Sequence, residues 1–193
     1  MEGMDAEIRR TIAQCPLCTV HLRRRQRVPM GEMPMPEYPG QFVSADLMGP
    51  LVESNQGCKY ILCILDHASG WVEAYPLPNK RAATVVDRFV NDYFPRAGYP
   101  ECILTDCGAE FLEKEWEEFL IKVGVEHRQT TVRHPQSNGK VERMNRTIKE
   151  TLRKLVNGEI TTWQEKLPAA LTAVRIAPSA STGHSPFYIY HAR

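Results

Sequence analysis

The 193-residue sequence predicts an α/β domain built on one mixed sheet, with three antiparallel strands, two further strands and flanking helices. Two observations support this fold class. Short β-rich runs separated by turn residues occupy residues 42–77, and helical and strand patterns alternate from residue 80 onward. The length suits one well-buried domain with a short appendage, and it is too short for two full domains.

Three consecutive β-rich runs open the predicted domain. FVSADLMG, KYILCILD and GWVEAYPL begin at residues 42, 59 and 70. Gly57 lies between the first two runs, and Ser69-Gly70 lies between the second and the third. We therefore expect an antiparallel meander of three strands.

A helix and a strand are expected next. Residues 80–94 space their apolar side chains at three and four positions, as in an amphipathic helix, and the residues are Ala83, Val86, Phe89 and Val90. Because proline cannot continue a helix from within, we expect this helix to end at Pro95. The run ECILT, at residues 101–105, predicts the fourth strand.

The remaining elements follow the same alternation. A second helix is expected over residues 113–124 with Gly124 as its stop, then a fifth strand over 125–131. Two more helices follow, residues 141–156 and residues 162–177, the last with Thr161 or Thr162 as N-cap. This order is that of an RNase H-like mixed α/β fold, although the order alone also suits several other α+β folds.

Composition excludes some classes of protein and leaves others open. The 24 Lys and Arg against 23 Asp and Glu give a net charge of +1, so bulk charge does not indicate a nucleic-acid partner. No apolar run is long enough for a membrane helix, and the N-terminus does not resemble a signal peptide, so we expect no membrane partner and no secretion. Three cysteines lie inside apolar runs and are expected as reduced core thiols: Cys58, Cys63 and Cys102.

The N-terminal region predicts an appendage to the domain. Residues 1–24 contain a short helical pattern running into CPLC, where Cys15 and Cys18 have the spacing of half a zinc site. Residues 1–14 contain no histidine, and His21 would give at most a third ligand, so we expect no stable zinc binding. Residues 25–40 are rich in proline and predict a linker to the domain at residues 41–193.

Three acidic residues are candidates for a catalytic centre: Asp46 within the first strand, Asp106 directly after the fourth, and Glu142 at the start of a long helix. Any one of them alone is more often a turn former or a helix cap. Together they suit phosphodiester chemistry, in which carboxylates from separate elements hold two metal ions about 4 Å apart. The 35 residues between Asp106 and Glu142 leave room for one helix and one strand.

The sequence resembles the integrases of retroviruses and gypsy-type LTR retrotransposons, most of all the vertebrate retroviral branch. The resemblance runs from about Phe42 to Phe187 and rests on DLMGP, DHASGWVEAYPL, TDCGAEF, HPQSNGKVERMNRTIKETL and STGHSPF. It implies a DDE-type polynucleotidyl transferase whose triad is Asp46, Asp106 and Glu142, with two Mg²⁺ or Mn²⁺ ions and no small-molecule cofactor. It also implies 3′-end processing and strand transfer of element DNA into target DNA. A homodimer or higher homo-oligomer is implied as well, and so is action in the nucleus after synthesis in the cytoplasm.

The long helix and the loop before it are expected to contact DNA. At about 100° per residue, Glu142 shares one face of the helix with Arg146, Lys149 and Arg153, apart from an apolar stripe that includes Val141 and Leu155. A basic row beside a metal-binding carboxylate suits DNA phosphates, although a solvated helix face is the alternative. The resemblance implies that Arg146 and Lys149 hold the element's end. The loop HPQSNGK adds Gln136, Asn138 and Lys140 as contacts. His134 is a candidate proton shuttle, but a histidine before a proline is more often structural, so it stays outside the predicted catalytic set.

Two other functions fit the same sequence. A catalytically silent, host-retained module could keep the fold for DNA binding or protein assembly, since the zinc half-site is incomplete and the sequence stops just after the predicted core. The intact acidic triad favours an enzyme over this alternative. A nuclease for RNA–DNA hybrids is disfavoured because HPQSNGKVER belongs to the integrase pattern. Cys107, where relatives usually carry Asn or Gln, and Tyr188, where they often carry Glu, depart from that pattern.

Overall fold

A computed structural model describes residues 36–130 and 139–192. The chain divides into two compact units, Met1–Met33 and Pro34–Arg193, and every described residue belongs to the second. The first unit contains Cys15 and Cys18, so the predicted zinc half-site lies outside the described residues, as does most of the predicted linker. The boundaries at residues 24 and 40 stay predictions.

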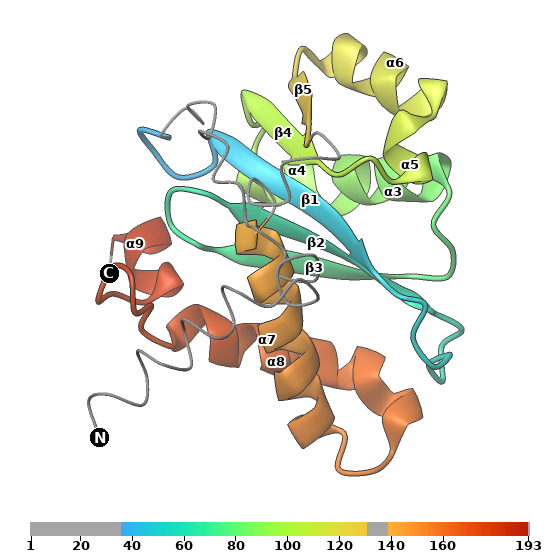
Figure 1. Cartoon of the computed structure of the whole chain (residues 1–193), viewed down its shortest axis with the longest axis vertical. Helices are drawn as coiled ribbons and strands as arrows, with labels where there is room; N and C mark the ends of the chain where they lie inside the picture. Colours follow the sequence, from blue (N-terminus) through green and yellow to red (C-terminus); the bar gives the residue numbers. More distant parts are fainter. Residues whose placement is uncertain (1–35, 131–138, 193) are drawn as a thin grey trace, which may run out of the picture. The chain divides into compact units, whose positions relative to one another are not determined.

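Five strands form one sheet in the order β3-β2-β1-β4-β5 (Figure 1). β1, β2 and β3 pair antiparallel, whereas β4 runs parallel to β1 and β5 runs parallel to β4. This confirms the predicted mixed sheet of three antiparallel strands plus two more. The strands are β1 (Phe42–Met48), β2 (Tyr60–Asp66), β3 (Val72–Leu77), β4 (Cys102–Thr105) and β5 (Glu126–Gln129).

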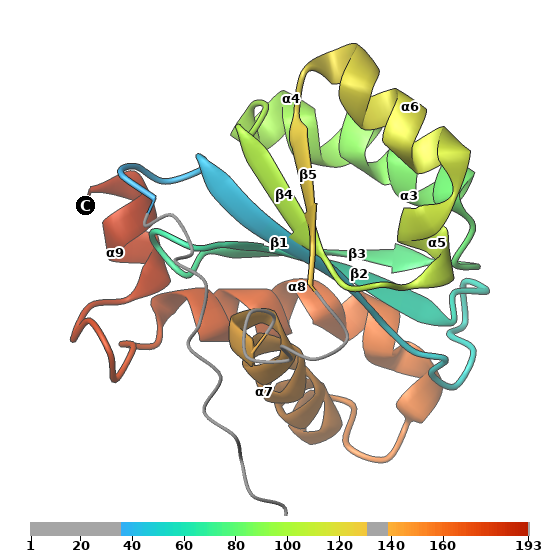
Figure 2. The same ribbon diagram turned by 45° about the horizontal axis from the view of Figure 1, so that its top comes forward.

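Helices cover both faces of the sheet (Figure 2). On one face lie α3 (Ala82–Arg88), η1 (Phe89–Tyr93), α4 (Phe94–Ala97), α5 (Ala109–Leu112) and α6 (Lys114–Val123). On the other lie α7 (Gly139–Leu155) and α8 (Trp163–Ile176), which a short 3-10 turn, η3 (Ile160–Thr162), connects. α9 (Pro186–His191) follows them near the end of the chain.

Alternation along the strands divides the core into two layers. In β2, Leu62 and Ile64 pack with α3 and α6, whereas Ile61 and Cys63 pack with α7 and α8. All four side chains are buried, because successive residues of a strand point to opposite faces and both faces are covered. β1 follows the same rule, since Val43 belongs to the first layer and Met48 to the second. Even-numbered residues of β1 therefore face α7.

The prediction that Pro95 ends the first helix is wrong. The helical segment continues through π-helical η1 into α4, where Pro95 occupies one of the first two positions. A proline is tolerated there because the opening N–H groups of a helix need no partner within it. The segment ends at Gly98, whose φ of +77° suits glycine.

Other predicted ends are partly confirmed. α6 ends as expected, because Gly124 adopts the left-handed conformation with φ +73°. Thr162 precedes α8 but gives no side-chain cap, since its hydroxyl donates to the carbonyl of Glu159 instead. α9 was not predicted as a helix. Its signal is the pair Ser185-Pro186, in which the Ser185 hydroxyl accepts from the Tyr188 N–H and Pro186 opens the helix.

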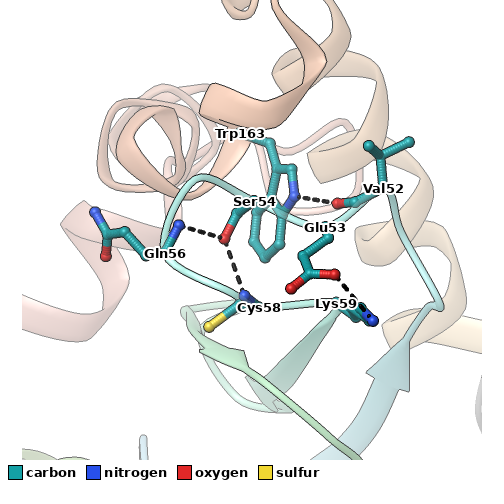
Figure 3. Close-up of polar contacts among 7 residues, drawn as sticks. All are labelled: Val52, Glu53, Ser54, Gln56, Cys58, Lys59 and Trp163. Carbon is teal, nitrogen blue, oxygen red and sulfur yellow. Dashed lines mark hydrogen bonds and ion pairs between the residues drawn. The ribbon is translucent and has the colours of Figure 1, made fainter.

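The loop between β1 and β2 is fastened to the start of α8 (Figure 3). The Trp163 indole N–H donates to the carbonyl of Val52 at 2.8 Å. The Ser54 hydroxyl accepts from the Cys58 N–H at 3.0 Å and donates to the Gln164 side-chain oxygen at 2.6 Å. The bonds of Trp163 and Gln164 join segments more than 100 residues apart in the sequence.

Replacing Ser54 by alanine is expected to cost about 1–3 kcal/mol of unfolding free energy. Ser54 is buried, and its loss leaves the Cys58 N–H and the Gln164 oxygen without their partner. Urea unfolding followed by far-UV circular dichroism measures the change. Ser181→Ala is the control, because Ser181 is exposed, and it should change the free energy by less than about 0.5 kcal/mol. Equal effects of the two substitutions would contradict this role of the loop.

The described cysteines and helices bear on two of the predictions made from composition. Cys58, Cys63 and Cys102 are buried free thiols, as predicted, and Cys107 is an exposed one. Within residues 36–130 and 139–192, no helix combines the length and the apolar character needed to cross a membrane.

Candidate active site

Asp46 lies in the central strand on the face that α7 covers. Its side chain is half-buried, and each carboxylate oxygen accepts one hydrogen bond from the protein. Oδ1 accepts from the Leu47 N–H at 2.8 Å, and Oδ2 accepts from the Asn145 side-chain amide at 2.7 Å. The second bond connects β1 to α7 and fixes which way the carboxylate points.

Asp106 reaches the same face through the pairing of β4 with β1. In this parallel pair Ser44 lies opposite Leu104, so continuing the register by two residues brings Asp106 beside Asp46. The Asp106 Oδ1 accepts from the Gly108 N–H at 3.0 Å. Two strands that are far apart in the sequence therefore deliver two carboxylates to one place.

Gly108 contributes to this turn through the space that it leaves, not through an unusual backbone conformation. Its φ of −59° is open to any residue. A β-carbon at this position would lie 2.8 Å from a carboxylate oxygen of Glu110 and 3.0 Å from one of Asp106. A larger residue here would require the carboxylates of Glu110 and Asp106 to move.

Glu142 comes from the first turn of α7, and its side chain is exposed. Its charge and that of Asp106 both raise the pKa of Asp46, so the three carboxylates lie within electrostatic reach of one another. A fourth acid, Glu110, also acts on Asp46. Glu110 is 7% exposed and lies 3.9 Å from the Lys80 ammonium.

Burial and neighbouring negative charge raise the pKa of Asp46 to about 6. Loss of hydration is the larger cause, and the charges of Asp106, Glu142 and Glu110 act in the same direction. The Leu47 N–H opposes them by stabilising the carboxylate. An Asp46 that is ionised at neutral pH therefore experiences uncompensated negative charge.

The carboxylates of Asp46, Asp106 and Glu142 have the chemistry that a divalent metal ion requires. Carboxylate oxygens are the ligands that Mg²⁺ prefers, and their mutual repulsion is what a cation would relieve. Among the residues that the structure describes, however, no group of three or more His, Cys, Asp or Glu is close enough to hold an ion as it stands. The donors fit in chemistry and in neighbourhood, but Asp46, Asp106 and Glu142 would have to draw closer to share an ion.

The residues predicted to contact DNA lie in different environments. Arg146 is exposed on α7, whereas Lys149 is half-buried. Lys140 turns its ammonium to the carbonyl of His67 at 3.3 Å, next to the end of β2. Three residues of the preceding loop lie outside the described part of the chain: His134, Gln136 and Asn138. Burial raises the pKa of the Cys63 thiol in β2, and the Lys149 charge opposes this shift.

Asn145 and Glu110 belong to the site and were not predicted. Asn145 is 6% exposed, and its Oδ1 has no hydrogen-bond partner among the described residues. A signal existed for Asn145, since it is a polar residue at the border of the apolar stripe of α7, three positions after Glu142. Glu110 had no such signal, because nothing in the local pattern of α5 shows that its side chain is buried.

Replacing Asp46 by asparagine is expected to stabilise the metal-free protein at pH 7.5 by up to about 3 kcal/mol. The folded-state pKa of about 6 lies above the unfolded value, so the stability that Asp46 contributes below pH 4 is lost as pH rises through 6. Asparagine stays neutral and avoids that loss. Urea unfolding in the presence of EDTA at pH 4 and pH 7.5 measures the difference, which should nearly vanish at pH 4.

Asp87→Asn is the control for this prediction, because Asp87 is an exposed aspartate of α3. It should change stability by less than about 0.5 kcal/mol at either pH. An Asp46→Asn protein that is no more stable than the parent at pH 7.5 would contradict the electrostatic description of the site.

Comparison with known proteins identifies the class to which this fold and this site belong. A family model described as integrase core domain matches residues 36–135, just over half of the chain. The chain therefore belongs to the retroviral integrase core family. The five-stranded mixed sheet with its flanking helices is the RNase H-like fold of that family, as predicted.

Individual relatives are viral polyproteins. The chain is 37% identical over 153 residues to the Gag-Pol polyprotein of avian reticuloendotheliosis virus, which covers 79% of this chain and 13% of that protein. It is 34% identical over 185 residues to the Pol polyprotein of feline endogenous virus ECE1, covering 95% of this chain and 18% of that protein. The chain thus spans less than a fifth of the length of these two relatives.

Solved structures share the fold at lower identity. The simian T-cell lymphotropic virus intasome, in complex with the PP2A regulatory subunit B56 gamma, has a TM-score of 0.75 and 18% identity over 97% of this chain and 67% of that one. The HTLV-2 integrase catalytic core in complex with magnesium, in a trimeric form, has a TM-score of 0.66 and 21% identity over 80% of this chain and 99% of that one.

Proposed function

We propose that this chain is a DNA integrase catalytic core that performs metal-dependent 3′-end processing and strand transfer of element DNA into target DNA. One observation carries the proposal. Carboxylates from β1, the end of β4 and the start of α7 converge closely enough for Asp106 and Glu142 to act on the ionisation of Asp46. Membership of the integrase core family supports the same reaction class.

Asp46, Asp106 and Glu142 are the residues that would hold two Mg²⁺ or Mn²⁺ ions. When bound, the ions supply positive charge that activates the attacking oxygen and stabilises the leaving one. The protein's own contribution is positional. The Asn145 amide and the Leu47 N–H orient the Asp46 carboxylate, and the Gly108 N–H orients that of Asp106. The attacking oxygen comes from water or from a DNA 3′-hydroxyl, so no serine or cysteine nucleophile is required.

The basic face of α7 is proposed to bind DNA phosphate beside these carboxylates. Arg146 and Arg153 are exposed on the face that carries Glu142, and Lys149 lies between them. Lys140, Gln136 and Asn138 are proposed as further contacts at the start of the helix. Homodimers or larger homo-oligomers acting in the nucleus complete the proposal, and the dimeric and trimeric forms of the HTLV-2 core are compatible with such assembly.

Replacing Arg146 by alanine is expected to weaken binding to duplex DNA about fivefold and to reduce the dependence of log affinity on log salt by about one unit. Fluorescence anisotropy with labelled DNA between 50 and 200 mM salt, about the range over which phosphate contacts dominate, measures both. Arg143→Ala is the matched control, because Arg143 is exposed on the same helix but about 60° further from the basic face. Equal effects of the two variants would exclude this face as the DNA site.

The second candidate function is a catalytically silent DNA-binding or assembly module. The observation that favours it is the lack, within the described residues, of three metal-binding side chains already close enough to hold an ion. A nicking and joining assay on a branched DNA substrate with Mg²⁺ or Mn²⁺ distinguishes the two functions. Metal-dependent products support the enzyme, and DNA binding without products supports the silent module.

A further inference from the structure

The outer edge of β5 presents backbone groups that no described residue pairs with. β5 is the last strand of the sheet, and the N–H groups of Glu126 and Thr130 donate to Glu101 and Thr105 on the β4 side at 2.9 Å each. Alternate residues of a strand direct their backbone groups to opposite sides. The N–H and C=O groups of His127 and Gln129 therefore point away from the sheet, where a further strand would pair.

A groove runs between this edge and α6. It has a volume of about 380 Å³ and is lined by Glu117, Leu120, Ile121, Val125, His127 and Gln129. Leu120 and Val125 are buried and form an apolar floor. Ile121 is 79% exposed, the highest value among the exposed large hydrophobic residues of the described chain. An apolar side chain with its surface in water thus lies beside unpaired backbone groups.

The opposite edge of the sheet is protected. β3 contains Pro76, which has no N–H to offer, and the Arg175 guanidinium donates to the Val72 carbonyl at 2.9 Å. Proline and covering side chains are the means by which proteins prevent unwanted pairing at sheet edges. Since β5 has no proline, the two edges differ in their capacity to accept another strand.

The charge around the groove indicates which kind of partner segment would bind in it. Residues 109–124 contain five glutamates against two lysines, and Glu117 itself lines the groove. This negative charge opposes DNA, in contrast to the basic face of α7. It favours a segment that carries lysine or arginine next to its apolar side chains.

We propose that this groove binds an extended segment of a partner protein as a sixth strand alongside β5. The segment's backbone pairs with His127 and Gln129, as in other cases of strand addition. An apolar side chain packs on Ile121 and the apolar floor, and a basic side chain two residues away faces Glu117, because side chains two apart share a face. The proposal does not depend on the catalytic function. The groove lies between β5 and α6, and its Gln129 end is opposite Thr105, the residue before Asp106.

The probe is a displayed library of random octapeptides selected on the full 193-residue chain. Enriched peptides are expected to alternate apolar and basic residues. On binding such a peptide, the backbone amides of His127 and Gln129 should exchange with deuterium about tenfold more slowly. The amides of Glu126 and Arg128 already face β4 and should change little.

Two variants test the backbone and the apolar contact separately. Gln129→Pro removes the outward N–H but leaves the β4 side intact, and Gln129→Ala is its control because it keeps that N–H. Ile121→Arg adds positive charge at an exposed position, and its control is Ile176→Arg, the same substitution at an exposed residue of α8 outside the groove. The proline and Ile121→Arg variants should each weaken peptide binding about tenfold or more, and the controls less than about twofold.

Several outcomes would overturn the proposal. They are a library that yields no alternating basic peptides, peptide binding unaffected by both Gln129→Pro and Ile121→Arg, and binding without protection of the His127 and Gln129 amides. Protection of these amides by duplex DNA, or by self-association of the chain in the absence of peptide, would assign the groove to a different occupant. Loss of nicking activity by any variant has no bearing on the result.

Discussion

Replacing Glu142 by glutamine is expected to slow metal-dependent DNA nicking and joining about a thousandfold, a loss of roughly 4 kcal/mol of transition-state stabilisation. Glutamine keeps the size of the side chain but removes the charge that would hold a divalent cation. Because Glu142 is exposed, the substitution should leave the stability of the fold unchanged within about 0.5 kcal/mol. Single-turnover rates on branched DNA, with protein in excess and Mg²⁺ or Mn²⁺ present, measure the effect.

Glu150→Gln is the matched control for this prediction. Glu150 is also exposed on α7, so the two variants have the same net charge and the same helix. Its rate should stay within about twofold of the parent, because it lies two turns away from Glu142. If both variants retain activity, the nuclease does not use the acidic triad. If the parent protein itself has no activity with either metal, the silent module is the better description.

Replacing Trp116 by alanine is expected to lower the unfolding free energy by about 3–5 kcal/mol, the largest effect on stability that we predict. Trp116 belongs to α6, and its side chain is fully buried in the core layer between the sheet and the helices α3 and α6. Its ring centroid lies 5.2 Å from that of Phe89 and 5.3 Å from that of Phe111. Its indole N–H also donates to the His127 ring at 3.3 Å. The substitution therefore leaves a large cavity and removes one of the two hydrogen-bond contacts of the His127 Nε2, which also lies 2.9 Å from the Thr105 hydroxyl.

Chemical unfolding of two further variants separates these causes. Trp116→Phe keeps most of the volume and loses the hydrogen bond, so it should cost about half as much as alanine. Tyr99→Ala is the control for loss of an aromatic ring at the surface, since Tyr99 is 66% exposed, and it should cost less than about 1 kcal/mol. A Trp116→Ala protein of nearly parental stability would show that this layer is not the principal core.

Much of the fold could be predicted because its signals are local. The strands β1 to β3 are short β-rich runs with turn residues between them, and α6 has both an apolar side and the stop signal Gly124. Pro95 misled the prediction, because a proline ends a helix only where its missing N–H and its ring interrupt the preceding turn, and here it lies at the start of α4 after π-helical η1. α9 is short, and its cap at Ser185 becomes meaningful only with the helix in place.

The acidic site was predictable in part. Asp46, Asp106 and Glu142 were chosen for their residue type and spacing, and the structure brings all three within electrostatic reach. Their catalytic role stays a prediction. Glu110 had no local signal, and the polar position of Asn145 beside the apolar stripe did not reveal its partner Asp46, which lies 99 positions away. The predicted apolar stripe of α7 is largely correct, but Leu155 at its end is 37% exposed.

The sequence by itself determined the alternation of strands and helices, the three candidate carboxylates and the basic side of α7, because each depends on residue type and on a period of two or 3.6 residues. Tertiary structure alone decided that β4 lies beside β1 and that β5 leaves an open edge beside α6. It also decided the contacts of the site, in which Asn145 orients Asp46 and Gly108 makes room for Glu110. The physical reason is that strand order and packing bring together groups whose separation along the chain carries no local signal.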